Sequence, residues 1–137
     1  MSPRRAICTF ALSALMLLSP AGLAAAQAQA GPAVTIAPAG TFSRAGTAGI
    51  SGTYDCGPST GFAFIEVTLT QDVGRFAITG SGIAEIPACA PGTTSGSWTA
   101  LVAGNGKFRG GSAFASARLV VDTAGVAENG TTVRLRS

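Results

Sequence analysis

Residues 62–71 read FAFIEVTLTQ, and this stretch decides the fold because apolar and polar side chains alternate along it. Successive side chains of a β-strand point to opposite sides, so a period of two predicts a strand with one buried face. The two faces would carry Ile65, Val67 and Leu69 on one side, and Phe64, Glu66, Thr68 and Thr70 on the other. We therefore expect residues 62–71 to form a strand of a half-buried sheet.

Stretches of the same kind occur on both sides of this strand. Those that we interpret as strands are residues 31–40, 48–56, 76–86, 97–103, 107–121 and 131–136, which gives about seven in all. We find no helix of note after residue 28. The sequence thus predicts an all-β fold, and the strand spacing favours an immunoglobulin-like antiparallel β-sandwich, with a small Greek-key barrel as the second choice.

Glycine-rich stretches suggest where these strands bend and turn. Gly104-Asn105-Gly106 predicts a tight hairpin, because Asn-Gly tolerates positive φ at both central positions. Gly80 and Gly82 predict a bulge or bend inside their strand. Residues 72–74 and 123–130 are expected to be turns.

The first 28 residues have the pattern of a cleavable signal peptide, helical in its apolar part. Arg4 and Arg5 precede residues 6–18, AICTFALSALMLL, which carry no charge. A membrane span needs about 20 apolar residues, and this run is shorter. Small side chains permit cleavage after Ala26, Ala28 or Ala30. We predict a secreted protein with residues 1–28 as signal peptide and 29–137 as one β-sandwich domain, without a membrane span after cleavage.

Removing the signal peptide nearly neutralises the chain. The formal net charge is +3, from nine basic and six acidic residues, and it falls to +1 when Arg4 and Arg5 leave. The remaining basic residues are scattered along the sequence, apart from Lys107 with Arg109 and Arg134 with Arg136. Each pair alternates as strand neighbours do, so we interpret the basic residues as solvated strand positions. This pattern gives no support to nucleic-acid binding.

Cys56 and Cys89 remain as an even pair once Cys8 is removed with the signal peptide. A disulfide is the expected state of such a pair in an exported chain. It would close a loop of 34 residues and stabilise the fold by about 3–4 kcal/mol on the chain-entropy model. There is no CxxC motif and no histidine, so we expect neither a metal site nor a redox site.

Several short motifs recur in a known group of proteins. They are Gly52-Thr53-Tyr54-Asp55-Cys56, Thr70-Gln71, Cys89, Trp98 and Phe108-x-x-Gly111-x-Ala113. In this order they resemble the small secreted actinobacterial proteins of uncharacterised function, which combine a signal peptide, a GTYxC strand and a second cysteine followed by tryptophan. An Asp-Gly usually follows the second cysteine in that group, whereas Ala90-Pro91 stands here. The resemblance implies export and a shared fold, and it implies no activity.

No arrangement of residues predicts catalysis or a cofactor. Without histidine, general acid–base chemistry would fall to carboxylates, Lys107 or Tyr54, and a glycosidase would need two convergent carboxylates. The acidic residues fall in no recognisable motif and are interpreted as surface charges: Asp55, Glu66, Asp72, Glu85, Asp122 and Glu128. We therefore expect a protein that is not an enzyme and carries no catalytic, cofactor-binding or metal-binding residues.

Binding is the function class that remains. Phe64 and Phe114 each share a predicted strand face with polar residues, so together they form a candidate contact patch. We expect a monomer that binds an unknown extracellular protein or cell-surface ligand and no nucleic acid. The alternative is an extracellular inhibitor or toxin-like protein that presents residues 88–97 to a partner enzyme.

Overall fold

The central strand, β4 (Ala63–Val73), has the alternation that its sequence predicts. Ile65, Val67 and Leu69 are buried, and the side chains between them face outward. β4 lies between β5 and β7, both antiparallel to it, and is fully paired along most of its length. The buried face of the sheet is therefore set by this one run of β-branched and aliphatic residues.

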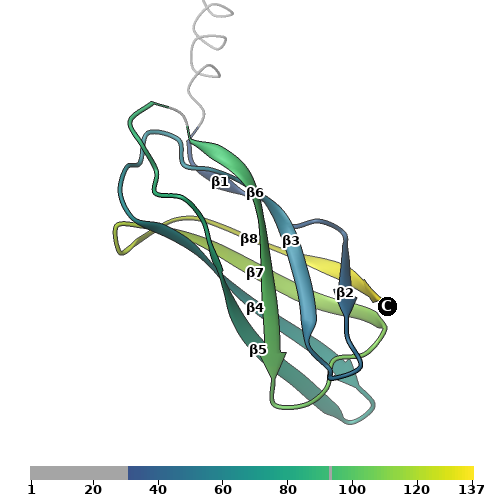
Figure 1. Ribbon diagram of the computed structural model, residues 1–137. Coiled ribbons are helices and arrows are strands. Elements are labelled where there is room, and N and C mark those ends of the chain that lie inside the picture. Colours follow the sequence, from purple (N-terminus) through teal and green to yellow (C-terminus); the bar gives the residue numbers. More distant parts are fainter. Residues whose placement is uncertain (1–30, 93) are drawn as a thin grey trace, which may run out of the picture. The chain divides into compact units, whose positions relative to one another are not determined.

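The computed structural model describes residues 31–92 and 94–137. These residues form eight strands and no helix (Figure 1). The other strands are β1 (Ala33–Val34), β2 (Ala39–Phe42), β3 (Ala48–Asp55), β5 (Phe76–Glu85), β6 (Ser95–Gly104), β7 (Gly111–Val121) and β8 (Ala124–Arg136). The all-β class is confirmed, whereas the predicted signal peptide lies outside the described residues.

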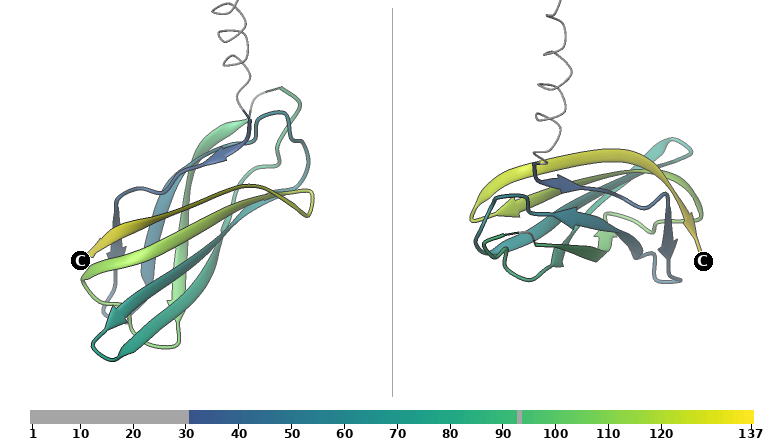
Figure 2. Two further views of the ribbon diagram at one scale, coloured as in Figure 1. Left: turned by 180° about the vertical axis from the view of Figure 1, so that it is seen from behind. Right: turned by 90° about the horizontal axis from the view of Figure 1, so that it is seen from above.

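Pairing continues around the whole sheet and closes it. The order is β1-β3-β2-β8-β7-β4-β5-β6, and β6 pairs again with β3, so seven strands form a closed barrel and β1 lies at its margin. Figure 2 shows β8 arching over one side, with β3 and β6 on the other. The structure is thus a closed sheet, whereas the sequence favoured an immunoglobulin-like sandwich. β2 and β8 are parallel, which also corrects the expectation of purely antiparallel pairing.

Glycines allow the sheet to close between β5 and β6. A Cβ atom on Gly82 would lie 2.2 Å from the carbonyl oxygen of Leu101, and one on Gly80 would lie 2.5 Å from that of Ala103. The predicted bulge at these glycines is wrong, because β4 and β5 pair without a register shift through both positions. The two glycines instead let the β6 backbone approach where a side chain would block it.

Two turns differ from their predictions for the same reason, namely the long-range pairing of the strands. Asn105-Gly106 does not form a hairpin, since β6 pairs with β3 and β5, and β7 pairs with β4 and β8. The Asn105 side chain instead accepts a hydrogen bond from the Thr79 amide at 3.1 Å. Residues 123–130 are mostly strand, because β8 begins at Ala124 after a two-residue turn.

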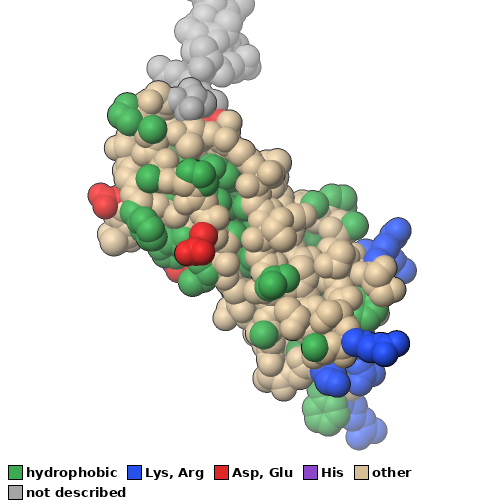
Figure 3. All heavy atoms as spheres, in the orientation of Figure 1, with side chains coloured by type: hydrophobic (Ala, Val, Ile, Leu, Met, Phe, Trp, Pro, Cys, Tyr) green, Lys and Arg blue, Asp and Glu red, His purple; other side chains and the backbone are tan. Residues whose placement is uncertain are grey.

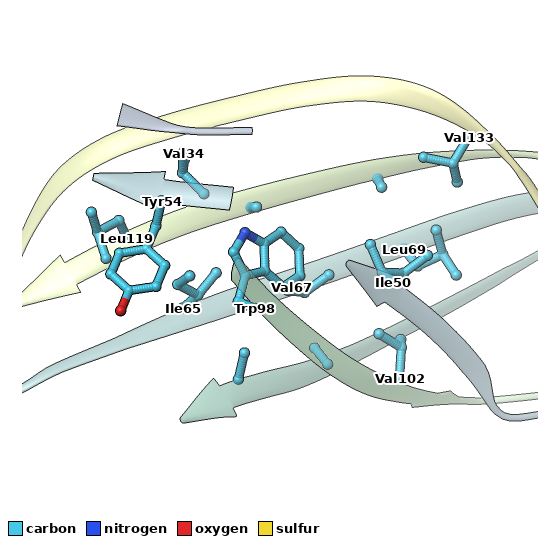
Figure 4. Packing of buried hydrophobic residues seen from close by; sticks show 14 of the residues in the cluster. Val34, Ile50, Tyr54, Ile65, Val67, Leu69, Trp98, Val102, Leu119 and Val133 are labelled. Carbon is cyan, nitrogen blue, oxygen red and sulfur yellow. The ribbon is translucent and has the colours of Figure 1, made fainter. Parts of the chain in front are cut away.

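The barrel interior is filled by side chains from every side (Figure 4). Trp98 lies at its centre, and its indole N–H donates to the Thr53 carbonyl at 3.1 Å. Tyr54 is buried beside it, so both aromatic residues belong to the core. Small alanines on β7 leave room in the interior for these large rings.

A disulfide joins Cys56, directly after β3, to Cys89 in the connection between β5 and β6. Both cysteines are buried. Cys89 also exchanges two backbone hydrogen bonds with Gly61, at 2.8 and 2.9 Å. The predicted pairing of the two cysteines is therefore present in the structure, and it ties two connections to the core at one end of the barrel.

Candidate functional site

The predicted patch residues share the outer face of the sheet but lie apart on it. Phe64 is paired with Val120, whereas Phe114 is paired with Thr70, six residues further along β4. That separation corresponds to about 20 Å along a strand. Phe64 is half-buried and Phe114 is 53% exposed. The structure does not bring the two rings together, and their role in contact stays a prediction.

Each ring of that patch has another neighbour. The Phe64 ring lies 6.0 Å from that of Phe62, which is 71% exposed. Phe114 lies over Gly130 of β8, where an added Cβ would come within 2.8 Å of its ring. Covering an exposed glycine with a neighbouring ring stabilises a sheet, so Phe114 has a structural task in addition to any role in contact.

The acidic residues are spread over the outside of the molecule. All are exposed except Asp55, which is half-buried and accepts a hydrogen bond from the Gly57 amide at 2.8 Å. Across residues 31–92 and 94–137, no group of three or more His, Cys, Asp or Glu side chains is placed to hold a metal ion. No helix in this part of the chain is long and apolar enough to cross a membrane.

Two open hollows occur on the surface. One of about 370 Å³ lies beside β1, β3 and β6 and is lined by Thr35, Thr53, Tyr54 and Asp55 among others. The other, of about 550 Å³, lies over β4 and β5 between Glu66 and Ile83. The first contains Asp55 and Tyr54 as ionisable groups and the second contains Glu66, so neither holds the two convergent carboxylates that a glycosidase would need.

The loop proposed for an inhibitor is shorter than residues 88–97. Residues 95–97 belong to β6, and Cys89 is fixed by the disulfide and by Gly61. The Thr94 hydroxyl accepts a hydrogen bond from the Ala90 amide at 2.9 Å. The connection is therefore held close to the barrel at both of its ends.

A different feature stands out at the opposite end of the barrel. Three connections meet there with the end of β8: residues 43–47, the turn at Gly74 and Arg75, and residues 105–110. Residues 43–47 contact residues 105–110, and these contact β5, since a Cβ atom added to Gly46 would lie 2.5 Å from Lys107 and one added to Gly106 would lie 3.4 Å from Ile78. The β2–β3 and β4–β5 hairpins and the β6–β7 connection all turn at this end, so segments far apart in sequence form one surface here.

Positive charge is concentrated on this surface, which we call the basic end. Its exposed cations are Arg44, Arg75, Lys107, Arg109, Arg134 and Arg136. Asp72 is the one acidic residue near them, so this end carries +5, whereas the rest of residues 31–137, with Arg118 and five carboxylates, carries −4. Figure 3 shows the blue cations gathered at one end, away from the red carboxylates. Basic residues that are scattered along the sequence are therefore gathered at one end of the folded chain.

The backbone of the basic end is fixed from inside the barrel. Gln71 is only 3% exposed, and its amide donates to the Arg109 carbonyl at 2.9 Å and accepts from the Arg109 N–H at 2.9 Å. Phe108 is 2% exposed, and its N–H donates to the Gly46 carbonyl at 3.0 Å. These contacts keep the Phe108 side chain in the barrel interior, and the flanking Lys107 and Arg109 are exposed.

An exposed aromatic ring lies among these cations. Phe76 directly follows the two-residue turn at Gly74 and Arg75, where Gly74 has a φ of 64°. It is 77% exposed, the highest fraction among the large apolar residues of the described part of the chain. The sequence analysis placed Phe76 at the start of a strand and assigned it no role, because the charges around it come from distant segments.

Comparison with known proteins adds no identity: no protein-family profile, no curated protein and no solved structure matches this chain. The resemblance to small secreted actinobacterial proteins therefore stays a prediction.

Proposed function

We propose that this is a secreted, non-enzymatic protein that acts by binding an anionic partner at a cell surface through its basic end. The observation that carries the proposal is the separation of charge, +5 at one end and −4 over the rest of residues 31–137. A net charge near zero would not attract a polyanion by itself. A molecule whose charges are separated is attracted at one end and repelled at the other, so it is also oriented.

Export is part of the same proposal. Residues 1–28 have the composition of a signal peptide, and a disulfide between Cys56 and Cys89 is typical of an oxidising compartment outside the cytosol. The resemblance to small secreted actinobacterial proteins supports the same location. Anionic polymers and lipids are the partners that such a location offers to a basic surface.

We also propose that the barrel is a closed variant of the immunoglobulin-like sandwich. Two strand groups support this, β3 with β6 and β8-β7-β4-β5, because the seams β2–β3 and β5–β6 that join them have only two residue pairs each. The first strand of such a sandwich would correspond here to two short strands. These are β1, which pairs with β3, and β2, which is parallel to β8. Sandwiches of this kind carry binding surfaces on the loops at their ends, and the basic end is such a surface.

The test is retention on an anionic matrix, with protein recovered from the medium of cells that express the full chain. The triple variant Arg75→Ser/Lys107→Ser/Arg109→Ser removes three cations from the basic end. At about 1 kcal/mol per cation near an anionic surface, its affinity should fall about 100-fold. On a dextran sulfate column it should elute at clearly lower salt than the wild type.

The matched control changes the net charge by the same amount elsewhere. Arg118→Ser/Ser97→Glu/Thr99→Glu alters exposed positions on the outer faces of β6 and β7. This variant should elute close to the wild type, because its basic end is intact. The proposal is wrong if the wild type is not retained at low salt, or if both variants elute at the same lowered salt.

A further inference from the structure

Phe76 makes the basic end different from a surface that binds only by charge. Its ring is 77% exposed and follows Arg75 directly at the tip of the β4–β5 turn. The other turns of this end contribute Arg44, Lys107 and Arg109 to the same surface. An apolar ring next to Arg75 is thus exposed at the end of the barrel that carries the cations.

The exposed Phe76 ring does not stabilise the folded protein, because its apolar surface stays in contact with water. A hydrated polyanion would be bound by the cations and would leave the ring in water. A bilayer of anionic lipid would use both features, because aromatic and aliphatic side chains bury at the boundary between headgroups and acyl chains while cations meet the phosphates.

We infer that the basic end docks on a bilayer containing anionic phospholipid, with the Phe76 ring inserted below the headgroups and the surrounding cations at the phosphate level. This rests on the proposed function, since it names the anionic partner of the same surface. The −4 charge on the rest of residues 31–137 holds the remainder of the barrel away from the bilayer and so fixes its orientation.

Cosedimentation with vesicles tests this, again with protein recovered from the medium of cells that express the full chain. Wild-type protein should bind vesicles of equal parts phosphatidylcholine and phosphatidylglycerol, and should not bind phosphatidylcholine alone. Phe76→Ser should lower the partition coefficient on the order of tenfold, because it removes one inserted aromatic side chain. Phe62→Ser is the matched control: it removes a phenylalanine that is 71% exposed at the other end of β4, and should leave binding unchanged.

Fluorescence gives a readout that a purely structural role of Phe76 would not produce. In Phe76→Trp the introduced indole should shift its emission to the blue when phosphatidylglycerol vesicles are added, and not with phosphatidylcholine. Trp98 is 3% exposed, so its emission forms a constant background.

The outcomes separate this inference from the proposed function. If the protein is retained on dextran sulfate but does not bind phosphatidylglycerol vesicles, the bilayer is the wrong partner and the anionic contact surface stands. If Phe76→Ser binds vesicles as tightly as Phe62→Ser, the ring does not insert and the inference is wrong. Failure to bind either the matrix or the vesicles overturns both.

Discussion

Gln71 connects the interior of the barrel to the surface that we propose as functional. Among residues 31–92 and 94–137 it is the single polar side chain that is fully buried, and both ends of its amide are used. Its partners are the N–H and carbonyl of Arg109, with Ser112 O as a more distant acceptor at 3.4 Å. Gln71 therefore satisfies the backbone of a connection that has no strand partner at this point.

We predict that Gln71→Ala lowers the free energy of unfolding by about 1–3 kcal/mol, because it leaves buried backbone groups without partners. Urea denaturation measures this loss, and hydrogen exchange at the Arg109 amide should become faster as the connection loosens. Thr70→Ala is the control, since Thr70 precedes Gln71 on the same strand and faces outward. Equal stability of the two variants would contradict the role assigned to Gln71.

The position of this residue on the inner face could be predicted from the sequence, but its partners could not. Gln71 continues the spacing of Ile65, Val67 and Leu69, so alternation alone places it inward. A polar residue at an inward position indicates a buried hydrogen bond. The partner, Arg109, is 38 residues away, and no local pattern brings the two together.

At the scale of the element, strands were predictable and their pairing was not. Alternation is a local property, and it placed β4 and its buried face correctly and predicted a strand at β3. The Asn105-Gly106 signal is also local, and it failed because hydrogen bonds to four other strands determine where β6 and β7 lie. Because β6 and β7 pair with other strands, residues 105–110 join two strands that are not neighbours in the sheet, and they form no hairpin.

At the seam between β5 and β6, the sequence correctly indicated an irregular place in the strand but not its cause. Gly80 and Gly82 do mark an irregular place in the sheet, as expected for glycine inside a strand. At these positions the β6 backbone comes close to β5, while the pairing of β5 with β4 continues without a bulge. Closure of the barrel thus depends on positions where a side chain is absent.

We predict that Gly82→Val opens this seam and destabilises the protein by about 1–3 kcal/mol or more, because the new Cβ would overlap the Leu101 carbonyl oxygen at 2.2 Å. Thermal unfolding measures the loss, and hydrogen exchange should increase at β6. Gly106→Ala is the control, because its added Cβ would meet only the Ile78 side chain at 3.4 Å. A stable Gly82→Val protein with unchanged exchange in β6 would argue against a closed seam.

At the scale of the whole molecule, the important property is where the charges lie. The formal net charge and the spacing of basic residues in the sequence suggested nothing, because the six cations of the basic end come from four separate segments of chain. The topology gathers them, since β4–β5 and β6–β7 both turn at the end where β8 finishes. A surface built in this way is visible only after the strand order is known.

Gathering like charges at one end also destabilises the folded state, because the cations repel one another. Arg75→Ser/Lys107→Ser/Arg109→Ser should therefore be more stable than the wild type at low salt, by about 0.5–1 kcal/mol. Urea denaturation at low and high salt measures the difference, which should vanish at high salt as the repulsion is screened. A variant that loses binding while gaining stability would indicate that these cations serve the contact surface. If the variant is instead less stable, or if its advantage persists at high salt, the cations contribute to the fold and their grouping follows from packing.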